Sequence, residues 1–477
     1  MKYICAIILL FNFLSFSSAQ EAKKEYGEKF EFDSENEKDP HFVLLDNYNS
    51  YLLSVIDVYG MMAGHQVIIR KFDQKNTLVE TFKYDFPIIG EKNMFNSSLF
   101  NYLGYAEGQN GKVAVFTEVY SNKAKTYQIH KLEFDKATAK FTSTVLAEGE
   151  IPSAMKSGWL DSEKSENGSY LAINYHKYRA KGTPDKNQLM VIDTKTLSVA
   201  WQKEVSFDNE FTSKKIAVTN SGKVVLVRDM NGSKKGITYL TVISANGQED
   251  KNFESQIFLG ELKSVSIGSQ EYLVALNGSA MNFKDESYRN LLLYDLQSGK
   301  ILNNNKITAF SFSSVKNITD VSIRSIMIQN NEMHIFAEAR TELKEKMTTG
   351  FEMMNAKEKY NFGPAYLFVL SFDGQLKATK KLSTQLYCSA DLHHSFGLAN
   401  IKGMYYVNAG EYYGVYVLGD NLQKEETKIS FNIPKWQTES PNQFVNQLFT
   451  YFPDKNSFLL AKVMSKGEMA LVNISGF

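Results

Sequence analysis

The chain has 477 residues, of which 43% are hydrophobic and 13% aromatic, so it can bury a large core and is not a disordered tail. Lysine plus arginine equals aspartate plus glutamate at 53 each, without a long basic run. This balance argues against a nucleic-acid partner. The length allows about two to four ordinary domains or one large repeated domain.

The first residues, MKYICAIILLFNFLSFSSAQ, predict a secretory signal peptide over 1–19. Lys2 supplies the positive start, and small residues precede Gln20. The apolar run of about 14 residues between them is shorter than the roughly 20 that a membrane-spanning helix needs. No later segment is apolar enough to span a membrane. We therefore expect an exported protein of the periplasm, the cell surface or the extracellular space, without a transmembrane segment.

Cleavage of that signal would remove Cys5 and leave Cys388 as the last cysteine, so a disulfide within the mature chain is not expected. Residues 20–40 are rich in Glu, Asp and Lys. They are interpreted either as a charged linker or, through the alternating KFEFD at Lys29–Asp33, as a strand that closes the fold. The main domain is expected over 41–477.

A strand repeat organises that domain. Apolar runs such as YLLSVID, KVAVFTEVY, SYLAINYH and KVVLVRD are each followed by a second run that ends in a turn, as in QLMVIDTKTL. Asp and Asn in these turns bond their own backbone, and Gly supplies positive φ. The matching turn positions, spaced by 47 to 78 residues, are Asp73, Asp135, Asp193, Ser244, Asp295, Asp373 and Asp420. A strand-rich period of about 50 to 60 residues is typical of four-stranded propeller blades.

The sequence therefore predicts an all-β chain that forms a single β-propeller of about eight four-stranded blades, with seven as the alternative. The final unit, SFLLAKV to EMALVNI, stops at Phe477 before any outer strand. The N-terminal strand would fill that vacancy and close the ring.

Two units resemble a known family. Asp193-Thr194-Lys195-Thr196-Leu197, followed by Trp201, resembles the D-x-x-T-G-x-x-x-W repeat of quinoprotein-like propellers in the WD40-like superfamily, and Asp295–Gly299 resembles the same turn. Leu197 stands where that repeat has Gly, and Asn303 where it has Trp. The segment 332–409 is similar to uncharacterised secreted bacterial propellers. The resemblance implies the fold alone and does not imply a quinone, and we expect no cofactor.

Propeller geometry places the loop between the second and third strands of each blade on the same face as the link to the next blade. These are the long segments of the chain, including 175–187, 278–290 and 340–364, and we call this side the long-loop face. Long loops on a rigid ring are where such folds carry function. The candidate binding residues there are Trp159, His176, Tyr178, Arg179, Arg340, Phe351, Met353, Met354 and Trp436. The alternative for each aromatic residue is that it fills a gap between blades.

The stretch CSADLHHS, at 388–395, contains a thiol, a carboxylate and two imidazoles. In an extended strand His393 and His394 point to opposite faces, so only Asp391 and His393 share one. Two ligands are fewer than the three or four that zinc takes from a protein. We therefore expect no metal site, and either an Asp391–His393 pair near the channel mouth or a simple strand entry.

Enzyme signatures such as G-x-S-x-G, H-E-x-x-H, a Walker loop and a Gly-rich dinucleotide turn are missing from the sequence. For Glu338 and Arg340, which share a strand face, an ion pair with the neighbouring blade is favoured over a catalytic acid. The sequence favours a non-catalytic binding or scaffold propeller that takes a protein, glycan or small-molecule ligand on its long-loop face and channel mouth. The alternative is a hydrolase, lyase or oxidoreductase whose site is assembled from several blades. Oligomeric state is not indicated.

Overall fold

The computed structural model describes most of the chain after the predicted signal peptide. The described residues are 23–33, 36–46, 48–58, 64–86, 99–121, 125–152, 158–208, 211–230, 238–252, 258–278, 290–306, 320–343, 359–383, 386–387, 396–408, 415–418, 424–429, 444–465 and 467–475. Within them the regular structure is almost entirely β-strand, with short 3-10 turns at η1 (Gln109–Gly111) and η5 (Pro453–Lys455). No helix in this part of the chain is both long and apolar enough to cross a membrane.

The first half of the chain forms four antiparallel sheets, each a meander of four strands in chain order. Blade 1 contains β3 (Glu37–Val43), β4 (Ser50–Val58), β5 (Gly64–Phe72) and β6 (Leu78–Asp85); blade 2 contains β7 (Leu99–Gly108), β8 (Lys112–Ser121), β9 (Thr126–Asp135) and β10 (Lys140–Glu150). Blade 3 contains β11 (Trp159–Lys164), β12 (Tyr170–His176), β13 (Asp185–Asp193) and β14 (Ser198–Phe207); blade 4 contains β15 (Phe211–Val218), β16 (Val224–Met230), β17 (Thr238–Ser244) and β18 (Gly247–Asn252).

The second half repeats this pattern. Blade 5 contains β19 (Phe258–Ile267), β20 (Gln270–Gly278), β21 (Asn290–Asp295) and β22 (Lys300–Lys306); blade 6 contains β23 (Asp320–Gln329), β24 (Glu332–Leu343), β25 (Lys359–Ser371) and β26 (Leu376–Ser383), with β27 (Leu386–Tyr387) on β25. Blade 7 contains β28 (Gly397–Ile401), β29 (Met404–Asn408), β30 (Val415–Leu418) and β31 (Lys424–Ile429); blade 8 contains β32 (Phe444–Phe452), β33 (Ser457–Ser465), β34 (Glu468–Ser475) and the N-terminal β1 (Lys23–Tyr26) and β2 (Phe30–Glu31).

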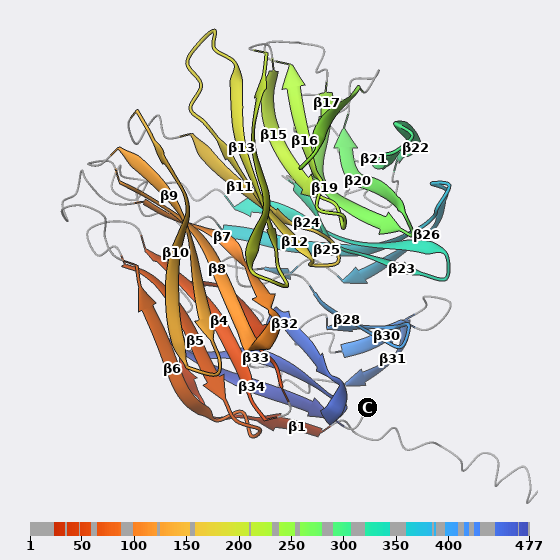
Figure 1. Ribbon diagram of the computed structural model, residues 1–477. Coiled ribbons are helices and arrows are strands. Elements are labelled where there is room, and N and C mark those ends of the chain that lie inside the picture. The colour runs from red at the N-terminus through yellow and green to blue at the C-terminus, as the bar shows by residue number, and fades with distance from the viewer. Residues whose placement is uncertain are drawn as a thin grey trace, which may run out of the picture.

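The eight blades follow one another around a ring, so that the last blade lies beside the first (Figure 1). The prediction of an eight-bladed β-propeller is confirmed. The core lies between the blades, because each sheet has an apolar face on both sides and must cover both. Between blades 2 and 3, for example, Phe116 and Ile129 of one sheet pack with Ile173 and Ile192 of the other. Full burial of one such side chain contributes about 1.5–3 kcal/mol.

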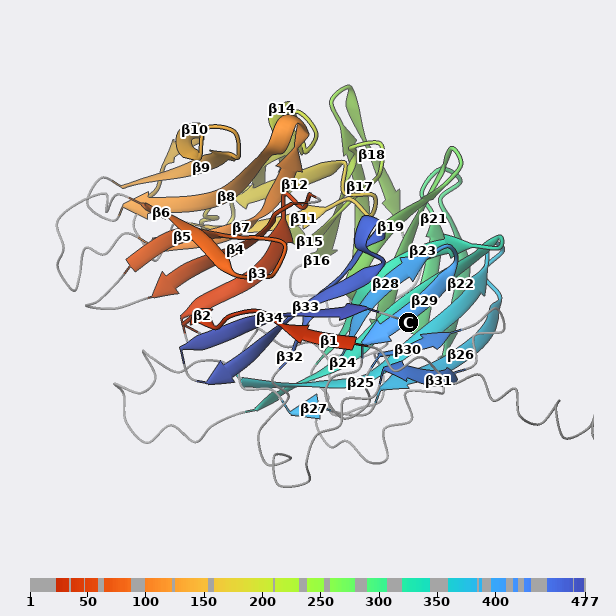
Figure 2. The ribbon, with the colours of Figure 1, turned by 90° about the horizontal axis from the view of Figure 1, so that it is seen from below.

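The N-terminal strand closes the ring, as predicted. Strand β1 pairs antiparallel with β34, with Lys23 opposite Ser475, and β2 continues along the same strand, with Phe30 opposite Met469. Figure 2 shows β1 against β34 at the outside of blade 8. The closing segment starts at Lys23, earlier than the predicted Lys29–Asp33. The alternation of apolar and charged residues in this segment matches its burial: Phe30 and Phe32 are buried, while Glu31 between them is exposed.

A buried ion pair of blade 1 contacts this N-terminal segment through its arginine. The Arg70 guanidinium forms two hydrogen bonds to the Glu37 carboxylate, at 2.7 and 2.6 Å, and the Ser54 hydroxyl donates to the same carboxylate at 2.6 Å. The side chains of Arg70 and Glu37 are only 4% and 3% exposed. The rings of Phe30 and Phe32 lie 5.7 and 5.5 Å from the guanidinium carbon, within the range of cation–π contacts.

The turns at the outer ends of the blades follow the predicted chemistry. Asp295 Oδ1 accepts hydrogen bonds from the backbone N–H groups of Gln297 and Ser298, and Asp193 Oδ1 accepts one from Thr196. Leu197 adopts a φ of 55° at the position where the resembled repeat has glycine. The backbone conformation of that repeat is therefore retained here by a residue that normally avoids it.

Candidate functional site

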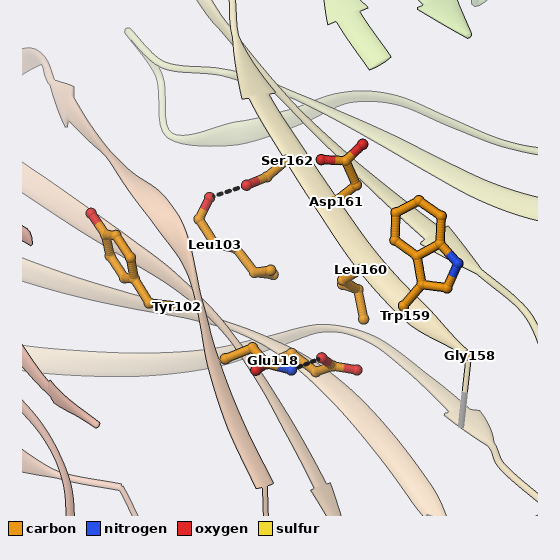
Figure 3. Close-up of a pocket in the computed structure, with 9 residues that line it drawn as sticks. Tyr102, Leu103, Glu118, Gly158, Trp159, Leu160, Asp161 and Ser162 are labelled. Atoms are coloured by element: carbon orange, nitrogen blue, oxygen red, sulfur yellow. Dashed lines mark hydrogen bonds between the residues drawn. The ribbon is translucent and has the colours of Figure 1, made fainter. Parts of the chain in front are cut away.

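A cavity of about 480 Å³ opens between blades 2 and 3 (Figure 3). It is lined by the start of β7, the end of β8 and the start of β11, through Asn101, Tyr102, Leu103, Glu118, Gly158, Trp159, Leu160, Asp161 and Ser162. The chain enters every inner strand from the long-loop face. The cavity therefore lies toward that face, where two neighbouring inner strands diverge.

Alternation along β11 sorts its side chains between the two neighbouring blades. The Ser162 hydroxyl donates to the Leu103 carbonyl oxygen of β7 at 2.5 Å, and Leu160 packs against the core that blades 2 and 3 share. Asp161 lies between them in the strand, so its side chain points the other way. Asp161 accordingly accepts a backbone hydrogen bond from Ile216 of β15, in blade 4. Strand β11, which forms this wall of the cavity, is therefore hydrogen-bonded both to blade 2 and to blade 4.

Glu118 forms a buried acidic wall of the cavity. The residue is 3% exposed, and the Asn101 side-chain amide donates to its carboxyl group at 2.6 Å across the β7–β8 pair. Desolvation by burial raises the pKa of Glu118 to about 7, although the Asn101 hydrogen bond acts in the opposite direction. The carboxyl group therefore titrates near neutral pH.

Asp161 is the second carboxyl group in the lining, and it comes from a different blade. Burial and then the nearby Glu163 raise the pKa of Asp161 to about 6, against the lowering effect of Lys215 and two backbone hydrogen bonds. In Figure 3 Glu118 and Asp161 lie on opposite sides of Leu160. A buried carboxyl group that lines a cavity and has a raised pKa, as Glu118 does, marks a candidate functional site.

Trp159 stands at the mouth of the cavity with 44% of its surface exposed. Its indole stacks on the buried His176 ring, with centroids 3.5 Å apart and planes 11° from parallel. The Asn174 amide donates to His176 Nε2 at 2.6 Å. Burial lowers the pKa of His176 to about 4, so the ring is neutral near pH 7 and serves as a platform for the indole.

The backbone around Trp159 approaches closely enough to require glycine. Gly158 has a φ of 87°, and a Cβ there would stand 2.0 Å from the His176 carbonyl oxygen and 3.0 Å from the Tyr178 backbone nitrogen. Tyr178 is 42% exposed beside it. Arg179 Nε donates to the Thr183 carbonyl oxygen at 3.0 Å within the same connection between β12 and β13.

The structure thus brings together three of the candidate binding residues proposed from sequence, Trp159, His176 and Tyr178, while Arg179 contacts Thr183 within its own connection. Arg340 lies elsewhere, on β24 opposite Asp320 and Phe362 in blade 6. The other candidates, Phe351, Met353, Met354, Asp391, His393 and Trp436, lie outside the described residues, and so does the whole stretch 388–395. The hypotheses on these residues stay predictions.

Of the nine residues that line the cavity, Trp159 alone was proposed from sequence, and the residues that were missed include Asn101, Glu118 and Asp161. Glu118 carried a signal, because it interrupts the apolar strand KVAVFTEVY as its only acidic residue. Glu338 shows how ambiguous such a signal is. It is fully buried, and Arg324 Nε lies 3.3 Å from its carboxylate. That partner is on the inner strand of the same blade rather than on the predicted neighbouring blade.

Charged groups also meet across the centre of the ring. Lys263 of blade 5 lies 2.5 Å from Glu163 of blade 3, and the Ile326 backbone N–H of blade 6 donates to Glu166 at 3.1 Å. Because these charged groups are already paired with protein groups, we do not propose a ligand site at the centre of the ring. In the described ranges no group of three or more His, Cys, Asp or Glu side chains is arranged to hold a metal ion.

No protein-family model matches the chain, and no curated protein matches it. Among solved structures, the Dos1 propeller aligns over 94% of both chains at 9% identity with a TM-score of 0.47. The propeller domain of the trilobed protease from Pyrococcus furiosus aligns over 84% of this chain and 97% of its own, at 11% identity and a TM-score of 0.37.

The acylaminoacyl peptidase of Pyrococcus horikoshii aligns over 90% of this chain at 12% identity and a TM-score of 0.37. This chain spans only 57% of the peptidase's length. The β-propeller class follows from the eight blades of the chain itself, and these neighbours say nothing about its ligand or activity.

Glu118 provides a test of the site's electrostatics through pH. Its pKa of about 7 in the folded chain lies above the ordinary 4.5, so between these values the folded state binds more protons than the unfolded state. Its contribution therefore lowers stability as pH rises through this window. We expect Glu118→Gln to flatten that fall by an amount on the order of a few kcal/mol.

Urea unfolding at pH 5 and pH 7.5 measures the effect as the difference between the variant and the wild type. Asp161, with a pKa raised in the same direction, contributes the same sign in both proteins and cancels in that difference. Parallel pH profiles for the two proteins would contradict the assigned burial of Glu118.

Proposed function

We propose that this protein is an exported, non-catalytic binding propeller that takes a small-molecule ligand in the cavity between blades 2 and 3. The observation that carries the proposal is the position of Trp159. Its indole is held flat on the buried His176 ring, yet almost half of the side chain remains exposed at the cavity mouth. An aromatic anchor fixed in advance loses little entropy when a ligand binds.

The dimensions and chemistry of the cavity support the same conclusion. Its volume of about 480 Å³ falls within the range of about 300–1,000 Å³ that small-molecule sites occupy. The lining combines apolar surface from Leu103, Leu160 and Trp159 with the polar groups of Asn101 and Glu118. The exposed surface of this lining is mainly polar, and fixed polar groups orient a ligand and discriminate between ligands.

Catalysis is the second candidate, and one observation favours it. Glu118 and Asp161 come from different blades and have raised pKa values of about 7 and about 6. Near neutral pH such groups can hold or release a proton. Turnover of a cavity ligand, lost in both Glu118→Gln and Asp161→Asn, would favour this class over simple binding.

The test compares two tryptophans of blade 3. We expect Trp159→Ala to weaken the binding of a cavity ligand by at least about tenfold, because truncation of an interface anchor costs about 2 kcal/mol or more. Its stability should change by only about 1 kcal/mol, the value of one ring stack. Trp201 is the matched control. It packs in the core between blades 3 and 4, and its Nε1 donates to the Gly222 carbonyl oxygen at 2.9 Å.

Trp201→Ala should therefore lower the free energy of unfolding by about 2 kcal/mol or more and leave binding unchanged. A thermal-shift screen of amines, sugars and amino acids supplies the ligand, and calorimetry on each variant supplies the dissociation constant. A ligand that binds wild type and Trp159→Ala equally would place the site elsewhere and overturn the proposed function.

A further inference from the structure

Glu118 is a buried acid that the protein itself does not neutralise. Among the described residues its carboxyl group has the neutral Asn101 amide as its hydrogen-bond partner and no lysine, arginine or histidine in an ion pair. Burial of an ionised carboxylate without a counter-charge is costly, and proteins normally avoid it. By contrast, the buried Glu37 of blade 1 is fully paired with Arg70.

The groups that surround Glu118 make this contrast sharper. From β7 the Asn101 amide contacts it, and from β9 and β12 the nearby titratable groups are the phenols of Tyr127 and Tyr175. Their rings lie 4.0 Å apart, and the Tyr127 hydroxyl donates to Gln188 at 3.0 Å. Burial, and to a smaller extent the charge of Glu118, raises the pKa of both phenols, so both stay neutral and neither supplies positive charge.

The remaining open side of Glu118 is the cavity. Its lining contains an exposed indole, Trp159, and no basic residue. A carboxylate next to an aromatic face is the combination that recognises an organic cation, since the ring attracts the positive charge and covers the attached alkyl chain. A neutral or anionic ligand would leave the buried acid without a partner.

We propose that the cavity between blades 2 and 3 binds a small organic amine, with its ammonium group against Glu118 and its alkyl chain along Trp159. This inference rests on the proposed binding function and specifies its ligand class. 1,4-Diaminobutane is a suitable probe of this class, because each of its ends carries an ammonium group near neutral pH.

Binding is coupled to proton release. An ammonium group binds the ionised form of Glu118, which in the free protein is only partly populated near neutral pH because the pKa is about 7. Affinity should therefore rise as pH increases from 6 to 8 and level off above that, until the amine itself deprotonates near its ordinary pKa of about 10.

The experiment is isothermal titration calorimetry of 1,4-diaminobutane into the full-length mature protein, at pH 6, 7 and 8. Wild type should bind more tightly at the higher pH and release protons, which titration in two buffers of different ionisation enthalpy detects. Glu118→Gln preserves the shape of the side chain and an acceptor for Asn101, and it should weaken binding at least about tenfold. Glu80→Gln removes the same charge from the exposed face of β6 and should leave affinity unchanged.

Two further probes separate the alternatives. Nα-acetyl-L-lysine amide tests whether a lysine side chain of a partner serves as well as a free diamine, and 1,4-butanediol tests the need for charge. Equal binding of the diol and the diamine would overturn the amine inference and leave the binding function standing. Lack of diamine binding at millimolar concentration, or equal loss in Glu118→Gln and Glu80→Gln, would also overturn it. If no ligand binds in a Trp159-dependent manner, the proposed function fails as well.

Discussion

Replacement of Arg70 with methionine is expected to lower the free energy of unfolding by about 3–5 kcal/mol. The guanidinium of Arg70 is the partner of the Glu37 carboxylate, and both side chains are almost completely buried. Methionine would leave that carboxylate without a counter-charge in a site that water does not reach. The contacts of the guanidinium with the Phe30 and Phe32 rings would be lost at the same time.

Chemical denaturation at pH 7 measures this loss. Lys112→Met is the matched control, because Lys112 forms an ion pair with Glu133 at 2.7 Å but is 39% exposed, and solvent-exposed pairs contribute little to stability. The double variant Arg70→Met with Glu37→Gln should recover part of the stability, since the unpaired charge is then gone. Equal effects of Arg70→Met and Lys112→Met would show that the blade 1 pair is not buried in solution.

Deletion of residues 21–33 is expected to lower the melting temperature markedly. The deletion removes β1 and β2 and exposes the backbone edge of β34 over Glu468–Ser475, while buried core contacts of Phe30 and Phe32 are also lost. Loss of two buried phenylalanine side chains alone would cost about 3 kcal/mol or more. The exposed edge is in addition a template for association between chains.

Thermal unfolding of the deleted chain against a chain that begins at Lys23 isolates the contribution of the closing strands. A synthetic peptide of residues 20–33, added to the deleted chain, should restore part of the melting temperature by pairing with β34. An unchanged melting temperature in the deleted chain would assign this segment to a linker after all.

The closing strand and the ring itself could be predicted from the sequence, because their signals are local. The turn aspartates at positions such as Asp193 and Asp295 bond their own backbone, and apolar strands recur between them at a steady period. The alternation of Phe30 and Phe32 with charged residues marks a strand with one buried face. Each of these patterns depends on residues a few positions apart.

The cavity was decided by tertiary structure. Asn101 and Glu118 come from blade 2, while Trp159 and Asp161 come from blade 3, and none of them forms a motif in the chain. The position of Trp159 was expected on the long-loop face, but its orientation depends on His176, which lies on the paired strand. The meaning of Glu118 likewise depends on the absence of a cation from the described residues around it.

The physical reason is that turns and strands depend on residues close together in the sequence, whereas the cavity depends on residues far apart in it. Turn chemistry and strand alternation act through neighbouring residues, so the sequence alone determined the repeated blades and their order. It left seven or eight blades open, and it gave the closing strand as one of two interpretations of residues 20–40. The space between two blades depends on how two packed sheets diverge and on which side chains fill the gap. Only the assembled ring decides whether a carboxyl group such as that of Glu118 pairs with a lysine, is buried in the core or lines a cavity.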